Sequence, residues 1–176
     1  MSEDIKIYNN GPDQIILEAD TVCNWHPDGA VKIRDHDPES LVKDPPISVP
    51  SILERAAKRH PDHPAMCVKR DGAWVEWTYN MYHQESRTVA KAFIKLGLER
   101  FCSVGILGFN APEWFIAQMG AIMAGGFSVG IYTTNTSDAC KYIADNCKAN
   151  IIVVEDEKQL EKVLKFKSDL SCIKVF

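Results

Sequence analysis

An 18-residue stretch without a charged side chain, FIAQMGAIMAGGFSVGIY at 115–132, constrains the fold of this chain more than any other feature. So apolar a segment must be shielded from water, either by a protein core or by lipid. Gln118 lies inside it, and glycines interrupt it at three places. Because glycine often ends a helix, and a strand-like run follows Gly125-Gly126, the stretch favours helix–turn–strand. We therefore predict no transmembrane segment.

The residues just before this stretch predict where its helix begins. In NAPEW at 110–114, Asn110 is a helix cap, Pro112 fits the first turn, and the Glu113 carboxylate can reach back to the cap. The predicted helix, 111–124, has no polar side, so we expect part of its cover to come from outside this chain. The glycines before it match no phosphate-binding pattern, and Glu113 would repel a phosphate, so a structural turn is favoured.

From residue 102 onward, runs rich in valine and isoleucine alternate with helical patterns. The predicted strands are 102–109, 127–132, 150–155 and 172–176, and the predicted helices are 111–124, about 137–147 and about 157–167. Strands that are apolar throughout and separated by helices are typical of a parallel sheet. The predicted fold class is therefore α/β, a parallel sheet with crossover helices, preceded by small β-hairpins.

The segment from 47 to 97 predicts two helices around a hairpin. Ser48 can cap a helix that ends at His60-Pro61, with an apolar side made of Ile52, Leu53, Ala56 and Ala57. Asp71-Gly72 joins two strand-like runs in a hairpin. Thr78 can cap the next helix, about 80–96, with Met81, Val89, Phe93 and Leu96 on its apolar side and Gly97 as its stop.

The first 46 residues have weaker patterns. Residues 1–20 are predicted to be an arm, 21–34 a small hairpin around HPDG, and 35–46 a charged connector with prolines. The predicted domains are thus an N-terminal arm with a small hairpin, 1–46, and an α/β domain, 47–176.

Composition excludes several classes of function. The net charge is −4, and no lysine–arginine cluster favours a nucleic-acid partner. The six cysteines form no CxxC pair and have no zinc spacing, so we predict reduced thiols and no metal site. Trp114 and Phe115 are predicted to be core residues. MSEDIKIYNN has no apolar centre, so a signal peptide is not expected.

The candidate binding residues are Tyr132, Thr133, Thr134 and Asn135. They follow the strand 127–132, and ligands of open parallel sheets bind beyond the carboxyl ends of strands. Their hydroxyl and amide groups suit the lining of a polar pocket. The alternative is a loop that only caps the next helix, through Thr136 or Ser137.

The stretch LGLERFCSVGILGFNAPEWFIAQMGAIMAGGFSVGIYTTNT at 96–136 closely resembles the bubblegum-type long-chain fatty acid–CoA ligases of the adenylate-forming superfamily. IMAGGFSVGIY resembles the second core motif of that superfamily. WTYNMYHQ at 77–84 resembles the weaker first motif, with Thr78-Tyr79 kept and Met81 and Tyr82 departing from it. TVCNWHPDGAVKIR at 21–34 also resembles the bubblegum group. The resemblance covers about residues 20–176, so 47–176 resembles an incomplete N-terminal portion of an AMP-binding domain.

The resemblance implies an enzyme that uses ATP, Mg²⁺ and coenzyme A to convert a long-chain fatty acid to acyl-CoA, AMP and pyrophosphate. It also implies a cytoplasmic location, with peripheral association to the endoplasmic reticulum or another intracellular membrane as an expectation. The serine-, threonine- and glycine-rich phosphate loop of such enzymes, which ends in lysine, has no counterpart in this sequence. We therefore expect an N-terminal fragment or short isoform that has no catalytic residues, binds no cofactor tightly and is inactive alone.

Two other functions remain open on the sequence. One is a non-catalytic binding or regulatory module that pairs with a complete enzyme. The other is an independent flavodoxin-like domain that binds a nucleotide. A reading frame that continues past Phe176 into a phosphate loop would favour the ligase, and tight nucleotide binding by the 176 residues would favour the flavodoxin-like domain.

Overall fold

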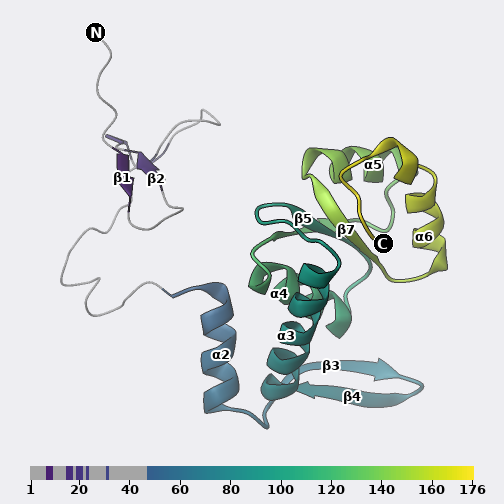
Figure 1. Cartoon of the computed structure of the whole chain (residues 1–176). Helices are drawn as coiled ribbons and strands as arrows, with labels where there is room; N and C mark the ends of the chain where they lie inside the picture. Colours follow the sequence, from purple (N-terminus) through teal and green to yellow (C-terminus); the bar gives the residue numbers. More distant parts are fainter. Residues whose placement is uncertain (1–6, 10–14, 18, 22, 24–30, 32–46) are drawn as a thin grey trace. The chain divides into compact units, whose positions relative to one another are not determined.

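The computed structural model describes residues 7–9, 15–17, 19–21, 23, 31 and 47–176 (Figure 1). The chain divides into two compact units, Met1–Pro46 and Ile47–Phe176. In the first unit, β1 (Ile7–Asn9) and β2 (Ile15–Leu17) pair antiparallel, where the sequence predicted only an arm. Strands of three residues are too short to leave a periodic pattern. Most of the hairpin predicted at 21–34 lies outside the described residues.

The second unit begins with the predicted helix and hairpin. Helix α2 spans Val49–Arg59, and the Ser51 amide donates to the Ser48 hydroxyl at 3.3 Å. Strands β3 (Pro64–Arg70) and β4 (Ala73–Thr78) pair antiparallel. Asp71 and Gly72 have φ values of 49° and 84°, the left-handed conformations that a two-residue hairpin turn requires, so this prediction is confirmed. Of the predicted apolar side of α2, Leu53 and Ala57 are buried but Ile52 is exposed.

Helix α3 (Tyr79–Lys95) is capped by Thr78, whose hydroxyl accepts a hydrogen bond from the Met81 amide at 3.2 Å. Gly97, with φ 94°, follows its end as predicted. The prediction of its buried side was wrong at Met81 and Leu96, which are exposed. Phe93 is buried as predicted, and the small residues Ser86 and Ala90 are also buried, on a helix that packs closely against another helix, α4.

Three parallel strands follow, which confirms the predicted fold class. The strands are β5 (Ser103–Leu107), β6 (Phe127–Ile131) and β7 (Ala149–Val154), in the order β6-β5-β7. The helices between and after them are α4 (Pro112–Met123), α5 (Ser137–Asn146) and α6 (Glu157–Leu164), followed by the short 3-10 helix η1 (Lys167–Asp169). The Thr136 hydroxyl caps α5 and Gly125, with φ 83°, follows α4, as the sequence predicted.

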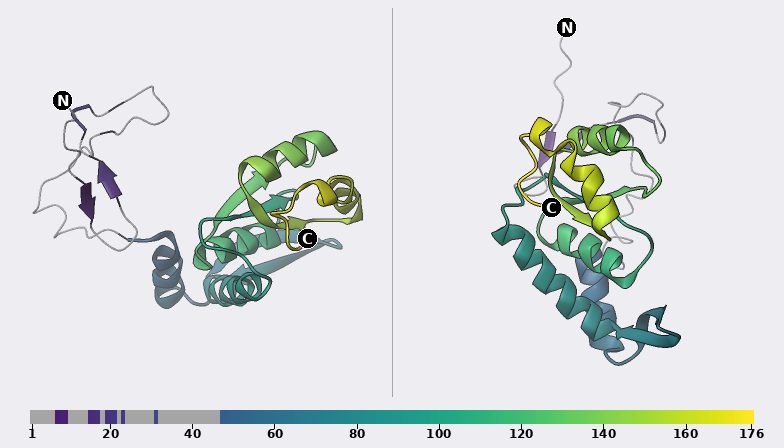
Figure 2. Two further views of the ribbon diagram at one scale, coloured as in Figure 1. Left: turned by 45° about the horizontal axis from the view of Figure 1, so that its top comes forward. Right: turned by 90° about the vertical axis from the view of Figure 1, so that its right-hand side faces the viewer.

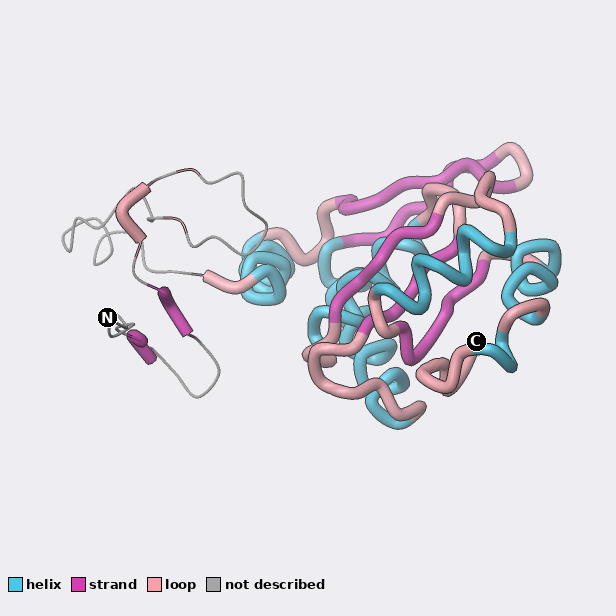
Figure 3. Tube along the Cα trace, turned by 90° about the horizontal axis from the view of Figure 1, so that it is seen from above, coloured by secondary structure: helices cyan, strands magenta, loops and turns pink. Residues whose placement is uncertain are grey.

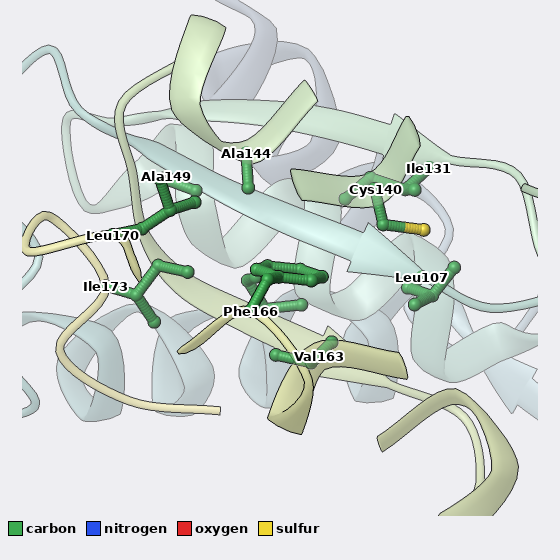
Figure 4. Close-up of a cluster of buried hydrophobic side chains, with 10 residues drawn as sticks. Leu107, Ile131, Cys140, Ala144, Ala149, Val163, Phe166, Leu170 and Ile173 are labelled. Atoms are coloured by element: carbon green, nitrogen blue, oxygen red, sulfur yellow. The ribbon is translucent and has the colours of Figure 1, made fainter. Parts of the chain in front are cut away.

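The sheet has a core on each face, because side chains of a strand alternate in direction. Leu107 and Ile152 pack with residues of α5 and α6, such as Cys140 and Val163 (Figure 4). Val104, Ile106 and Ile151 pack against α3 and α4. Figures 1 and 2 show the resulting layers, with α3 and α4 on one side of the strands and α5 and α6 on the other. Figure 3 shows the helices and strands of these layers from above. Burial raises the pKa of the Cys140 and Cys147 thiols, so neither is suited to act as a nucleophile.

The start of α4 differs from the prediction. Its N-cap residue is Ala111, which makes no side-chain capping bond, so Asn110 is not the cap. The Glu113 carboxylate does not reach back but accepts a hydrogen bond from the Arg70 guanidinium at 2.6 Å. The physical reason is that Arg70, at the end of β3, offers a charged donor, and charge-assisted hydrogen bonds are the stronger ones.

The apolar surface of α4 was predicted to be shielded partly from outside this chain, and the structure differs. Its buried residues include Ile116, Met119, Gly120 and Ala121, and α3 packs along it within this chain. At Gly120 an added Cβ would lie 2.6 Å from Cγ1 of Val89 on α3. Most of the apolar surface of α4 is therefore covered by this chain itself, while Phe115 is 41% exposed and is not the predicted core residue.

The strand predicted at 172–176 is reduced to one isolated bridge. Val175 bridges Ile151 in parallel, and its carbonyl accepts from the Ile152 amide at 3.0 Å. The backbone amide of the neighbouring Lys174 donates to the Asn150 carbonyl at 2.7 Å, and its Nζ donates to the Gly97 carbonyl and the Glu99 carboxylate. Among the described residues, no helix has the length and apolar character needed to cross a membrane.

Candidate functional site

The carboxyl ends of the three parallel strands lie in line. Leu107 of β5 is in register with Ile131 of β6 and with Val154 of β7. The loops that follow these strands therefore meet at one edge of the sheet, where ligands of open α/β sheets bind. Gly108–Ala111, Tyr132–Thr136 and Glu155–Asp156 make this edge.

A hollow of about 440 Å³, called the Tyr132 hollow here, opens between the first two of these loops. Its lining residues are Gly108, Phe109, Asn110, Trp114, Gly130, Ile131, Tyr132, Thr133 and Thr134. None of them is charged. Aromatic faces, hydroxyl groups and one amide line the hollow, so it suits an uncharged group that stacks and accepts or donates a few hydrogen bonds.

Three of the four predicted site residues line this hollow. Tyr132 is 80% exposed, Thr134 is exposed and Thr133 is half-buried. Asn135 does not line it. Its amide donates to the Tyr132 carbonyl at 3.0 Å, which closes the loop as a turn. The helix cap that was predicted as the alternative role of this loop is also present. The Thr136 hydroxyl accepts a hydrogen bond from the Ala139 amide at 3.3 Å and so caps α5.

The sequence did not predict Phe109 and Trp114 at the site. Phe109 is 72% exposed. Trp114 is half-buried, packs against the core as predicted, and also lines the hollow from the first turn of α4. The rule that ligands bind beyond the carboxyl ends of parallel strands selected Tyr132–Asn135. The same rule applies to Phe109, which follows β5 at the same edge. Trp114 joins the site only because the start of α4 lies beside β6 in the folded chain. There, a Cβ added to Gly130 would lie 3.4 Å from the Trp114 ring.

A second hollow of about 370 Å³, the Arg70 hollow, lies on the other side of the β5 end. Ile106, Leu107, Val153 and Val154 give it apolar walls, and Arg70, Glu113 and Glu155 are its charged residues. Glu155 accepts a hydrogen bond from the Phe109 amide at 2.6 Å and so joins the loops after β5 and β7. The hydrogen bond from Arg70 lowers the pKa of Glu113, which is therefore ionised at neutral pH.

The residues at this edge were also compared with the ligands that metal ions require. In the part of the chain that the structure describes, no group of three histidine, cysteine, aspartate or glutamate residues could hold a metal ion. The donor set of the Tyr132 hollow is hydroxyl, amide and aromatic, which does not fit a magnesium ion held by the protein.

The comparisons with known proteins agree on one family. The family model described as AMP-binding enzyme matches residues 53–175. A Xenopus laevis protein named long-chain-fatty-acid–CoA ligase ACSBG2 is 50% identical over 149 residues, which are 84% of this chain and 20% of that protein. A Rattus norvegicus protein named long-chain-fatty-acid–CoA ligase ACSBG1 is 43% identical over 160 residues, 90% of this chain and 22% of that protein.

Solved structures share the fold at lower identity. The anthranilate CoA ligase AuaEII, solved in complex with anthranoyl-AMP, is 24% identical, with a TM-score of 0.66 over 74% of this chain and 25% of that one. The N-terminal domain of FACL13 from Mycobacterium tuberculosis is 16% identical, with a TM-score of 0.67 over 74% of this chain and 33% of that one.

Proposed function

Because the chain belongs to the AMP-binding enzyme family, we propose that it is the N-terminal part of a long-chain fatty acid–CoA ligase. The observation that carries the proposal is the 50% identity over 149 residues to a relative of that name. The chain spans about a fifth of the length of the curated relatives it matches. The activity of the whole protein is therefore part of the proposal.

The proposed reaction has two steps. A carboxylate oxygen of the fatty acid bonds to the α-phosphorus of ATP, and the bond to pyrophosphate breaks, which gives an acyl-adenylate. The thiolate of coenzyme A then bonds to the acyl carbonyl carbon, and AMP leaves with the electrons of the broken bond. Both steps bring anions together, so they need positioning and neutralisation of charge, for which Mg²⁺ is the expected cofactor.

In this reaction the Tyr132 hollow would hold an uncharged part of a substrate. We assign Tyr132, Thr133 and Thr134 to contact with that part, and Asn135 to closing the turn beneath it. The hollow has no charged lining residue, so it does not fit a triphosphate. The groups that neutralise the phosphates, hold Mg²⁺ and bind coenzyme A are therefore assigned to the rest of the enzyme.

The test is an assay of the complete protein that contains residues 1–176, with ATP, Mg²⁺, coenzyme A and fatty acids of several chain lengths. We expect acyl-CoA and one equivalent each of AMP and pyrophosphate, with the Xenopus laevis relative as positive control. A folded complete protein that forms no acyl-CoA from any of these acids would overturn the proposal. Release of phosphate or ADP in place of pyrophosphate and AMP would also overturn it.

We further propose that the complete enzyme is cytoplasmic and associates peripherally with the endoplasmic reticulum or another intracellular membrane, because its proposed substrate partitions into lipid. The check is fractionation of cells followed by a high-salt or carbonate wash. Release of the protein by the wash is expected, and retention in the membrane pellet after carbonate would contradict a peripheral association.

A further inference from the structure

Lys162, on α6, makes two hydrogen bonds to the loop that carries the candidate site. Its Nζ donates to the carbonyl oxygen of Thr133 at 2.6 Å and to that of Asn135 at 3.1 Å. In the reverse direction, the Ser137 hydroxyl donates to the Lys162 carbonyl at 2.7 Å. Three hydrogen bonds therefore join α6 to the segment 133–137, although the two lie far apart in sequence.

The surroundings of Lys162 differ from those of its neighbours. Lys158 and Lys165, on or next to the same helix, are exposed, whereas Lys162 is half-buried. Moving an ammonium group out of water and fixing a long side chain are both unfavourable unless hydrogen bonds compensate. Here two backbone carbonyls of one loop supply them, so the position of Nζ and the shape of the loop depend on each other.

The shape of the loop decides what faces the Tyr132 hollow. Tyr132, Thr133 and Thr134 line the hollow, while the carbonyls of Thr133 and Asn135 are held by Lys162. Within the loop, the backbone bond from the Asn135 amide to the Tyr132 carbonyl closes the turn. A loop with one such bond needs outside contacts to keep a single shape.

We propose that Lys162 is a positioning residue for substrate binding. It is not among the residues that line the Tyr132 hollow, and it acts by holding Thr133 and Thr134 in the orientation that lines it. This inference rests on the proposed function, and it adds a residue about 30 positions away in the sequence that neither family motifs nor the strand-end rule selects.

The first arm of the test measures the loop itself, in the complete protein that contains residues 1–176. Hydrogen exchange followed by mass spectrometry is compared for the wild type, Lys162→Met, Lys162→Arg and the control Lys165→Met. In Lys162→Met we expect exchange at 133–137 to be faster by about tenfold or more, because charge-assisted hydrogen bonds are lost. Arginine can donate to both carbonyls, so Lys162→Arg is expected to restore much of the protection. Unchanged exchange in Lys162→Met would overturn the proposal.

The second arm measures ligase kinetics of the same variants with ATP and palmitate. A positioning role predicts a KM for one substrate that is about fivefold or more higher in Lys162→Met, a kcat that changes less, and recovery in Lys162→Arg. If Lys162→Met and Lys162→Arg lose kcat equally and both keep the KM of the wild type, the role of Lys162 is purely structural and the proposal is overturned. A wild-type protein without ligase activity would instead overturn the proposed function, and the exchange arm would still decide whether Lys162 orders the loop.

Discussion

Gly120 is where helices α3 and α4 leave no room for a side chain. A Cβ at this position would lie 2.6 Å from Cγ1 and 3.1 Å from Cβ of Val89, and 3.3 Å from the backbone nitrogen of Ala90. The first distance is far inside van der Waals contact and the other two are tight, so the Val89 side chain or one of the helices would have to shift. A glycine inside a helix is otherwise unfavourable, and here the close approach of the two helices explains it.

We therefore predict that Gly120→Ala destabilises the fold by about 1–3 kcal/mol, because overpacking outweighs the better helix propensity of alanine. Urea unfolding of the two proteins measures the difference. In a Val89→Ala background the penalty is expected to fall by about half or more, since the methyl group that clashes is removed. A stabilising effect of Gly120→Ala in both backgrounds would contradict the close approach.

At the scale of the elements, the starts of α4 and α5 are fixed in different ways. Helix α5 begins with a local signal, the Thr136 hydroxyl on the Ala139 amide. Helix α4 has no side-chain cap and is tied to the hairpin by the bond between Glu113 and Arg70. Both helices begin beside the Tyr132 hollow, so these contacts position the loops that line it.

For α5 we predict that Thr136→Ala costs about 1 kcal/mol of stability, the usual effect of losing a hydroxyl cap. Thr136→Ser keeps the hydroxyl and serves as the matched control, with a change of a few tenths of a kcal/mol at most. Chemical denaturation measures both. Equal losses for alanine and serine would mean that the hydroxyl is not the stabilising group.

For α4 we predict a dependence on pH. The hydrogen bond from Arg70 lowers the folded-state pKa of Glu113 below the ordinary carboxyl value of about 4.3. Stability from this pair is therefore complete above about pH 4.3 and is lost as the pH falls through the folded-state pKa. Glu113→Gln should lower the free energy of unfolding at neutral pH, by at most about 1 kcal/mol because both side chains are largely exposed and screened.

The measurement for this pair is urea unfolding of wild type and Glu113→Gln from pH 7 down to about pH 2, so that the carboxyl is progressively protonated. The difference between the two proteins should shrink as the pH falls. A difference that stays constant across this range would show that the charge of Glu113 does not stabilise the start of α4.

At the scale of the whole molecule, residues 47–176 form layers, and the edge at the carboxyl ends of the strands is open. The two faces of the sheet are covered by helices, whereas the carboxyl edge leaves Phe109 and Tyr132 largely exposed. Large exposed aromatic groups beside a hollow are typical of a binding surface. The unit thus presents one side of a site, and the proposed function requires positively charged groups for its anionic substrates, which the Tyr132 hollow lacks.

We predict that the 176-residue chain by itself forms no acyl-adenylate. Adenylation needs a cradle of backbone amides and a cation for the triphosphate, and the sequence contains no glycine-rich loop that ends in lysine. The measurement is exchange of labelled pyrophosphate into ATP with a long-chain fatty acid and Mg²⁺, with the complete protein as positive control. Exchange above the no-protein blank that persists through repurification would reveal a phosphate site in this chain.

The sequence by itself determined the elements whose signals are local. The Asp71-Gly72 turn, the Thr78 and Thr136 caps and the glycines at 97 and 125 each depend on the conformation or hydrogen bonds of a few neighbouring residues, and all lie where they were predicted. The parallel sheet followed from the alternation of apolar strands and helices. The choice of Tyr132–Asn135 followed from one topological rule, and its role as a binding loop stays a prediction.

The tertiary structure alone decided the features that join distant residues. Glu113 could cap its own helix, and only the folded hairpin brings Arg70 within 2.6 Å of it. The cover of α4, the place of Trp114 at the hollow and the contact of Lys162 with the Thr133 carbonyl likewise join separate elements. Local patterns report what a few neighbouring residues favour, whereas these contacts depend on how whole elements pack, because the side chains involved meet only after the sheet and its helices are assembled.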